Sequence, residues 1–268
     1  MLLLNTRLAS RILAVALAFG WAGAAVAQQK SPQGDTWDSI AKLPDFSGVW
    51  QSVLNKAGGE GQTQRNPAPF TPQWKKKAAD LAATRKRSGD VEGRNKYCLP
   101  LGFPGGMAGP QEYHEFHFTP GQVTIADEQG YVRRIYTDGR KHHVGPPTLQ
   151  GDSIGHWEGD TLVVDTVNMQ AGNEIEYGLA GGKNMHVIER MHLKAGSPGR
   201  MVIDEVIDAP QAFTQPYKFS TEYERLPRGL IEFDCEQNNR DVTPSGHQTI
   251  DMNAPANMGA SKIGRAHV

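Results

Sequence analysis

Histidines and carboxylates occur in segments that otherwise read as strands, and a histidine beside a carboxylate is the common equipment of general acid/base catalysis. The candidates for such a pair are His186 or His143 as the base and Glu189 or Glu128 as its partner. Alternation along a strand places His186 on one face and Glu189 on the other. A proton-transfer site built from these residues therefore depends on how the strands pack together.

Two consecutive arginines, Arg133 and Arg134, form a second chemical feature, because alternation points them to opposite faces of one strand. One of them is expected inside the fold, where a charge is costly unless it is paired; Glu128, Glu189 and Glu236 are the available partners. Such a cluster either closes a barrel end as a structural ion-pair network or orients a ligand at the base of an apolar interior. The residues expected to contact that ligand are Arg134, Tyr136, Arg190, Trp157, Phe116, Tyr217 and Glu236.

Metal and cofactor chemistry have weaker signals in the sequence. Glu115 and His117 share one face of a predicted strand and are the weak candidates for metal ligands. The segment Gly151 to Gly155 has the glycine and serine spacing of a nucleophile elbow, but it lies in a strand pattern with no helix after it. The chain has no glycine-rich phosphate loop, no His-Glu-x-x-His and no Cys-x-x-Cys motif. We therefore expect neither a cofactor nor a metal.

The composition is that of an ordinary globular protein. Of its 268 residues, 38% are hydrophobic and 21% are charged, with 28 Lys+Arg against 29 Asp+Glu. This balance excludes a disordered chain, a collagen-like repeat and a nucleic-acid-binding domain of the basic type. The expected partner is a small molecule and not a nucleic acid.

The two ends of the chain are expected to lie outside the fold. Residues 1–27 have a positive start, an apolar run and a small-residue ending, as in an export signal. The protein is therefore expected to be periplasmic or secreted, and not to span the membrane after cleavage. Residues 262–268 match the translation of a sequencing adapter and are interpreted as an artefact. Export also makes Cys98 and Cys235 candidates for a disulfide.

The elements that position these side chains read as short strands separated by turns. One helix is predicted from Pro72 to about Lys86, with Thr71 as its cap. We predict an all-β fold, an antiparallel meander that forms a closed or nearly closed barrel of the lipocalin or calycin type, with one helix; a two-sheet β-sandwich is the alternative. After a first strand near Gly48, strands are predicted over 113–118, 122–127, 131–137, 153–157, 161–168, 185–193, 200–208, 217–225 and 230–236.

Four motifs carry a resemblance to other sequences. They are Cys98-Leu99-Pro100, Val132 to Arg140 (VRRIYTDGR), Gly151 to Thr166 (GDSIGHWEGDTLVVDT) and Cys235 to Asn239 (CEQNN). Together they resemble an uncharacterised family of secreted bacterial proteins over about residues 98–240, although Lys141-His142-His143-Val144 replaces the family's usual histidine-proline. The segment Gly48-Val49-Trp50 is similar to the glycine-x-tryptophan that opens lipocalin barrels. We divide the chain accordingly into 28–97 (arm, first strand and helix), 98–240 (main β domain) and 241–261 (C-terminal extension).

Two functions of different classes follow from these observations. The first is an exported β-barrel that binds a small apolar or aromatic molecule in its interior. The alternative is a cofactor-free acid/base enzyme, such as a hydratase, lyase or isomerase, that uses a His/carboxylate pair in the same interior. A histidine and a carboxylate facing each other within hydrogen-bond reach favour the enzyme, and scattered, externally paired charges favour the binding protein. A purely structural envelope protein is a third possibility.

Overall fold

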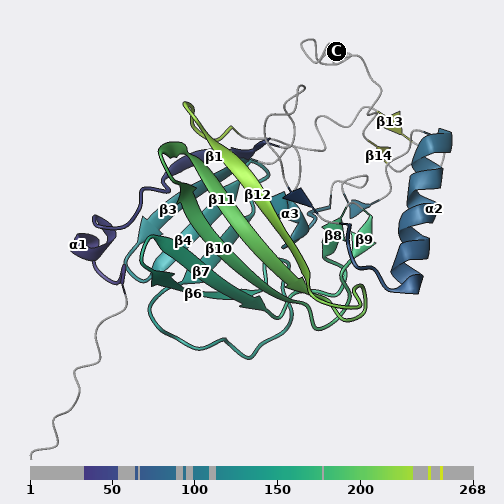
Figure 1. Ribbon diagram of the computed structural model, residues 1–268, viewed down its shortest axis with the longest axis horizontal. Coiled ribbons are helices and arrows are strands. Elements are labelled where there is room, and N and C mark those ends of the chain that lie inside the picture. Colours follow the sequence, from purple (N-terminus) through teal and green to yellow (C-terminus); the bar gives the residue numbers. More distant parts are fainter. Residues whose placement is uncertain are drawn as a thin grey trace, which may run out of the picture. The chain divides into compact units, whose positions relative to one another are not determined.

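Nine strands close into a barrel in the computed structural model of the protein (Figure 1). The structure describes residues 33–53, 64–65, 67–88, 93–94, 99–108, 113–176, 178–231, 241–242 and 248–249. The barrel strands are β1 (Gly48–Ser52), β3 (Tyr113–Thr119), β4 (Gln122–Asp127), β5 (Val132–Tyr136), β6 (Asp152–Glu158), β7 (Thr161–Val167), β10 (His186–Lys194), β11 (Ser197–Asp208) and β12 (Tyr217–Leu226). The predicted all-β barrel is thus confirmed, and the two-sheet sandwich is not the fold.

The barrel closes because the first strand pairs with two partners. On one side β1 pairs with β3, and on the other side it pairs antiparallel with β12, with Val49 opposite Leu226. Eight of the nine neighbouring strand pairs are antiparallel, but β5 and β6 run parallel, with Ile135 opposite Ser153. The prediction of a purely antiparallel meander was therefore wrong at this one pair. Residues 137–151 make the long return that a parallel connection requires.

Tight turns explain why most strand limits agree with the predicted ones. The β3–β4 hairpin turns at Pro120 and Gly121, whose φ of 73° is favourable only for glycine. The backbone N–H of Thr137 donates to the carbonyl of Gly121, which links this turn to the end of β5. The turns therefore fix the register, and the register fixes which side chains face inward.

The smaller strands lie beside the barrel or apart from it. Strand β2 (Gln64–Arg65) extends the sheet at β12, β8 (Glu174–Glu176) pairs with β9 (Leu179–Ala180), and β13 (Asp241–Val242) pairs with β14 (Gln248–Thr249). No strand begins in the two described residues of the predicted strand 230–236, and its remaining residues lie outside the described part. The export segment, the adapter-like tail, Cys98 and Cys235 also lie outside it, so the structure does not test the disulfide.

Helix α2 (Pro72–Ser88) is the predicted helix, and α1 (Trp37–Ile40) and α3 (Gly105–Ala108) are single turns. The buried Trp74 anchors α2, because its indole Nε1 donates to the carbonyl of Ala180 at 2.8 Å. Thr71 occupies the expected position before α2, where its carbonyl accepts from the backbone N–H of Lys75 at 2.8 Å, and its hydroxyl donates to the carbonyl of Gln211 at 3.2 Å. No described helix is both long and apolar enough to cross a membrane.

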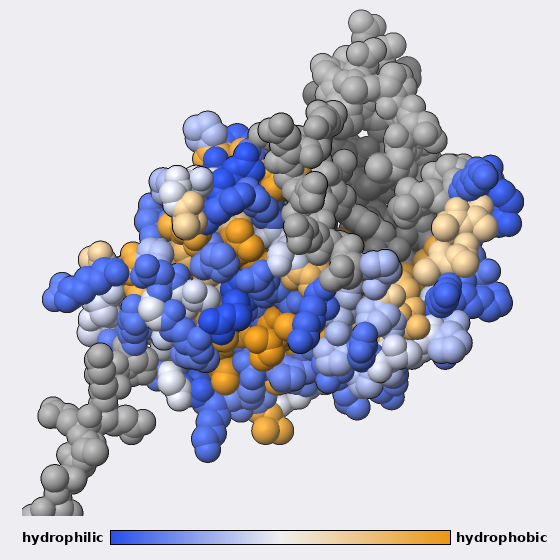
Figure 2. All heavy atoms as spheres, viewed as in Figure 1, coloured by the Kyte–Doolittle hydropathy of each residue, from blue (hydrophilic) through white to orange (hydrophobic). Residues whose placement is uncertain are grey.

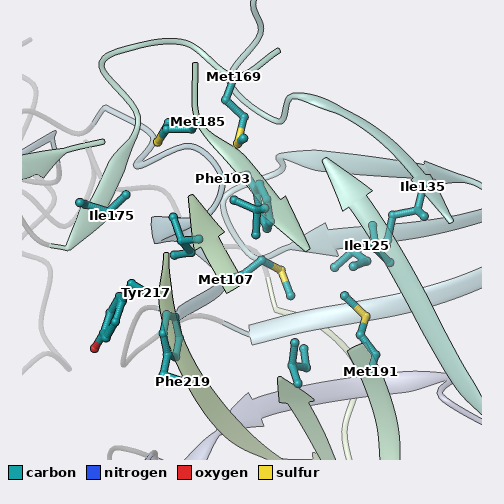
Figure 3. Packing of buried hydrophobic residues seen from close by; sticks show 14 of the residues in the cluster. Phe103, Met107, Ile125, Ile135, Met169, Ile175, Met185, Met191, Tyr217 and Phe219 are labelled. Atoms are coloured by element: carbon teal, nitrogen blue, oxygen red, sulfur yellow. The ribbon is translucent and has the colours of Figure 1, made fainter. Parts of the chain in front are cut away.

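Apolar side chains fill the middle of the barrel and continue under the segment that covers one end (Figure 3). Figure 3 shows Phe103 and Met107 among the strands, close to the inward-facing Ile125 and Met191. On the outside, hydrophilic residues cover most of the visible face, and apolar residues form small separate groups (Figure 2). The barrel thus has an ordinary solvated exterior and a densely occupied interior.

Candidate functional site

A belt of buried polar side chains crosses the apolar barrel interior. Eight of the nine barrel strands contribute one member each, and every member is at most 3% exposed. Burying this many polar groups is unfavourable unless they bond to one another or to a ligand, so the belt is the first candidate site. The members of this polar belt are Ser52, His114, Arg133, Ser153, Thr166, Glu189, Glu205 and Thr221.

One side of the polar belt is a buried ion pair. The guanidinium of Arg133 donates to both carboxylate oxygens of Glu189, at 3.0 and 2.5 Å. Its remaining N–H groups reach the hydroxyls of Thr166 at 2.9 Å and Ser153 at 3.3 Å, and the ring of Phe103 lies 3.7 Å from the guanidinium carbon. Four of the five N–H groups of the guanidinium thus have a partner, and a ring covers one of its faces. These contacts are those of a structural ion-pair network, one of the two alternatives considered for the buried arginine.

The other side of the polar belt contains a fully buried histidine. Burial, followed by the positive charge of Arg133, lowers the pKa of His114 to about 4. The ring of Tyr223 lies 6.3 Å from the His114 ring in an edge-on arrangement. Since the backbone groups of Met107 and Gly106 counteract the shift only in part, His114 is a neutral imidazole at neutral pH.

Three polar atoms of this side have no hydrogen-bond partner among the described residues. They are the Oγ of Ser52, the Nε2 of His114 and the Oγ1 of Thr221. The three residues lie on β1, β3 and β12, and β1 is the direct neighbour of the other two strands. A buried polar atom without a partner costs about 1–3 kcal/mol, so three of them on adjacent strands are a feature that needs a chemical reason.

Residues 99–108, which we call the plug segment, cover the polar belt. Phe103 packs on Arg133, and the hydroxyl of Tyr223 donates to the carbonyl of Met107. The buried side chain of Asn173 holds the plug segment from outside, because its Nδ2 donates to the carbonyl of Phe103 at 2.9 Å. The plug segment therefore separates the polar belt from solvent at this end of the barrel.

A second group of ionisable side chains lies on the outer wall of the barrel, and we call it the outer cluster. The Nδ1 of His142 is 2.8 Å from Asp152, and its Nε2 is 3.3 Å from the Oδ1 of Asp165. The same oxygen of Asp165 is 2.8 Å from the Nε2 of His186. The four side chains come from β6, β7, β10 and the loop after β5, and they form one chain of acid and base groups.

The predicted catalytic residues do not meet. His186 faces outward and pairs with Asp165, whereas Glu189 faces inward and pairs with Arg133. His143 is exposed and contributes only its backbone N–H, which donates to Asp152. The predicted His/carboxylate pair in the interior is therefore wrong, because His186 and Glu189 lie on opposite faces of β10.

Glu128 lies apart from these residues in the β4–β5 turn. The pKa of its carboxyl is raised to about 7, because partial burial and the charge of Asp127 outweigh the opposite effect of the nearby Arg228. No predicted catalytic histidine is its partner in the structure. A raised carboxyl pKa beside a turn is a local consequence of burial here.

Only part of the predicted ligand-contacting set faces inward. Phe116 and Tyr217 are buried, but Tyr217 packs against Phe213 and Phe219, and Trp157 packs against Phe46 and Phe118. Three expected contacts lie on the outside instead: Arg134 is exposed, Arg190 pairs with Glu158, and the ring of Tyr136 lies under Arg140. Glu236 lies outside the described residues.

The outward position of Arg134 corrects the choice between the two consecutive arginines. Arg133 shares the buried face of β5 with Ile135, so Arg133 is the arginine inside. Each arginine shares its face of β5 with an apolar or aromatic residue: Arg133 with Ile135, and Arg134 with Val132 and Tyr136. The alternation pattern alone therefore did not indicate which arginine is buried.

The weak metal candidates form a simple pair. The Nε2 of His117 lies 3.2 Å from the carboxylate of Glu115 on a partly exposed face of β3. Throughout the described ranges, no group of three His, Cys, Asp or Glu side chains is placed to hold a metal ion. Ser153, the serine of the elbow-like spacing, is buried in β6 and bonds to Thr166 at 2.9 Å, so it is not presented as a nucleophile.

Several residues of the two sites were not predicted from the sequence, and His114 and Asp165 are the clearest examples. His114 was assigned no role, although its position in an alternating strand with Phe116 marked it as inward-facing. Asp165 lies in a run of β-branched residues, and the sequence did not indicate its pairing with His186.

Comparison of the chain with protein-family models, curated proteins and solved structures gave no match.

Proposed function

We propose that the protein is a binding protein whose barrel interior holds a small molecule with an apolar or aromatic body and one polar group. The observation that carries this proposal is the set of three unpartnered buried atoms on Ser52, His114 and Thr221. Two hydroxyls and a neutral imidazole offer both donors and acceptors, which suits a hydroxyl, carbonyl or amide group of a ligand.

Aromatic and aliphatic side chains around these atoms support an apolar ligand body. Trp50 lies opposite His114 in the β1–β3 register, and Tyr223 lies opposite Ser52 in the β1–β12 register. Both aromatic residues are at most 1% exposed, and Phe116 is equally buried one alternation further along β3. Flat rings beside a small number of fixed polar groups are the usual composition of a small-molecule site.

The plug segment is the entrance that this proposal requires. It meets the polar belt through Phe103, the carbonyl of Met107 and the residues between them. Asn173 fixes the plug segment by donating to Phe103 and Leu149. In this proposal a ligand reaches Ser52, His114 and Thr221 when the hydrogen bonds that hold the plug segment open, among them those from Glu174 N–H to Leu101 and from Phe103 N–H to Leu149.

We also propose that the protein acts after export, in the periplasm or outside the cell. The support for this is the positive, apolar and small-residue sequence of residues 1–27. A binding protein in these compartments meets small molecules that arrive from the environment. N-terminal sequencing of the protein recovered from its host tests this part separately, and a mature chain that begins near Gln28 is the expected result.

Native mass spectrometry of the full chain, purified from its own host without denaturation, tests the binding proposal. We expect a retained organic mass in the wild type. In the Thr221→Val variant the retained fraction is expected to fall about tenfold, because one ligand hydrogen bond is worth about 1.4 kcal/mol. Thr137→Val is the matched control, since Thr137 is equally buried but lies beyond the end of β5.

Two results contradict the proposal. One is a wild-type protein that carries no organic mass after purification and that takes up none from an extract of the host's growth medium. The other is a retained mass that is lost equally in the Thr221→Val and Thr137→Val variants, because that outcome places the ligand away from β12.

A further inference from the structure

The two histidines of the outer cluster are held by carboxylates in different ways. His142 has a carboxylate at each ring nitrogen, Asp152 at 2.8 Å and Asp165 at 3.3 Å. A neutral imidazole carries one N–H and can donate to only one of them, whereas an imidazolium can donate to both. The Nε2 of His142 is buried and makes no hydrogen bond among the described residues, so the carboxylate of Asp165 is its nearest charged neighbour, at 3.3 Å.

His186 is held in a different way. Its Nε2 lies 2.8 Å from the Oδ1 of Asp165, and its side chain is 44% exposed. A carboxylate at Nε2 favours the tautomer with the proton on that nitrogen and leaves the lone pair on Nδ1. Because the side chain reaches solvent, this lone pair is available to a molecule that arrives from outside.

We propose that the outer cluster is a general-base site that hydrolyses small carboxylic esters, with His186 as the catalytic base and Asp165 and His142 as positioning residues. Water is the nucleophile, because the site is open to solvent and no cysteine, serine or threonine joins its hydrogen-bonded chain among the described residues. This site is independent of the binding interior, since Asp165 and Thr166 point to opposite sides of β7.

The chemical step balances with the ester and water alone. The Nδ1 of His186 takes a proton from water while the hydroxide oxygen bonds to the carbonyl carbon. The tetrahedral intermediate then breaks its bond to the alcohol oxygen, and that oxygen receives the proton from Nδ1. The products are a carboxylic acid and an alcohol, and Asp165 holds the imidazole in place throughout.

The surroundings of the outer cluster suit an ester of modest size. Val144, two residues after His142, is 95% exposed and offers apolar surface beside the cluster. Asp208 is exposed and lies opposite His186 in the β10–β11 register, and Asp165 contacts His186 directly. With Asp165 and Asp208 near His186, a neutral ester approaches more easily than a negatively charged one.

Hydrolysis of p-nitrophenyl acetate by the full chain is the test. We expect the rate to fall at least about tenfold in His186→Gln, within the range that a positioned base contributes. His192→Gln is the matched control, because His192 lies on the same strand, is 36% exposed and has its carboxylate Asp204 at the longer distance of 3.5 Å. Its rate is expected to equal that of the wild type.

The Asp165→Asn variant provides a second measurement, which is unaffected if Asp165 only stabilises the fold. In nitrogen-15 spectra of the wild type we expect the Nε2–H tautomer at His186, and in Asp165→Asn a mixture of tautomers together with a shifted pH–rate profile. Equal ester hydrolysis in the wild type and His186→Gln overturns the proposal. So does an unchanged His186 tautomer and an unchanged pH–rate profile in Asp165→Asn.

Discussion

Glu189 and Arg190 are consecutive residues of β10, yet they belong to two different environments. Glu189 points inward, where it and Arg133 are at most 3% exposed and bond at 3.0 and 2.5 Å. Arg190 points outward and meets Glu158 at 2.8 Å, with both side chains close to half exposed. The same ion-pair chemistry is thus repeated on the two faces of one strand. The two pairs differ in how much hydration their charges have lost on folding. This difference determines how much stability is lost when one partner is removed.

The comparison extends from these pairs to the two candidate sites. The interior polar belt is shielded by the plug segment, and its histidine has a pKa lowered to about 4. In the outer cluster the side chain of His186 is 44% exposed and that of His142 is 26% exposed. Burial therefore fixes the groups of the polar belt, and exposure leaves His186 accessible to dissolved molecules.

Removing one partner of the buried pair should have the largest effect. Arg133→Met leaves the carboxylate of Glu189 buried and without its cation, which we expect to lower the free energy of unfolding by about 3–5 kcal/mol. Urea denaturation at pH 7 measures this. The double variant Arg133→Met, Glu189→Leu should recover most of the loss, and a double variant as unstable as the single one contradicts the assignment of the cost to the stranded charge.

The pH dependence of stability should show the next largest effect. Because the pKa of His114 is about 4 in the folded protein and 6.5 is its ordinary value, the unfolded chain binds the proton more readily. Stability should therefore fall as the pH is lowered from about 6.5 to about 4, by about 3 kcal/mol in total. Denaturation curves across this range, compared with those of His114→Gln, measure it.

Glu128 acts in the opposite direction over part of the same range. Its pKa is raised to about 7, so its contribution decreases as the pH rises from its ordinary value of 4.5 toward 7. The difference between the wild type and His114→Gln removes this contribution, since both proteins contain Glu128. Parallel stability curves for the two proteins contradict the role given to His114.

An alanine in the plug segment should have an intermediate effect. A Cβ at Gly102 lies 2.5 Å from the side chain of Asn173, and its φ of 74° is unfavourable for alanine. We expect Gly102→Ala to cost about 1–3 kcal/mol and to expose the polar belt. Gly130→Ala is the control, because its φ of 82° is similar but nothing lies within 4 Å of its Cβ. Equal costs at both positions show that backbone strain alone acts, without displacement of Asn173.

The exposed pair of the comparison should have the smallest effect. Glu158→Gln removes the partner of Arg190 on the outer wall, where water can replace the lost contact. We expect no measurable change in the urea midpoint, in contrast to Arg133→Met. A loss of stability similar to that of Arg133→Met means that exposure does not separate the two pairs.

The sequence predicts the strands better than it predicts the sites, and the reason is physical. Alternation and turn residues are local, so the limits of β3, β4 and β7 agree with expectation to within about one residue. The parallel pairing of β5 and β6 depends on the course of residues 137–151, which carry no regular pattern. The site residues depend on register between distant strands, as the placement of Asp165 opposite Ile188 shows.

The arginine choice shows the same limit at one position. Where two charged residues are adjacent, the alternating pattern does not indicate which of them faces inward. In the structure, Arg133 is the buried one because it shares its face with Ile135. The outer cluster could not be predicted, because it needs the pairing of β7 with β10 to join Asp165 to His186 and the course of residues 137–151 to place His142. Local patterns therefore identify the scaffold, and long-range pairing assembles the chemistry.

The closure of the barrel by β1 and β12 also has a consequence for the rate of folding. Val49 pairs with Leu226, so the last seam of the barrel joins segments that are separated by almost the whole described chain. Contacts between such distant segments form slowly, because the intervening chain must first lose its freedom. We expect hydrogen exchange during refolding to protect the β10–β11 hairpin early and β1 last. During synthesis the barrel cannot close before residue 226 has been added. The chain therefore stays unfolded until most of it has been synthesised.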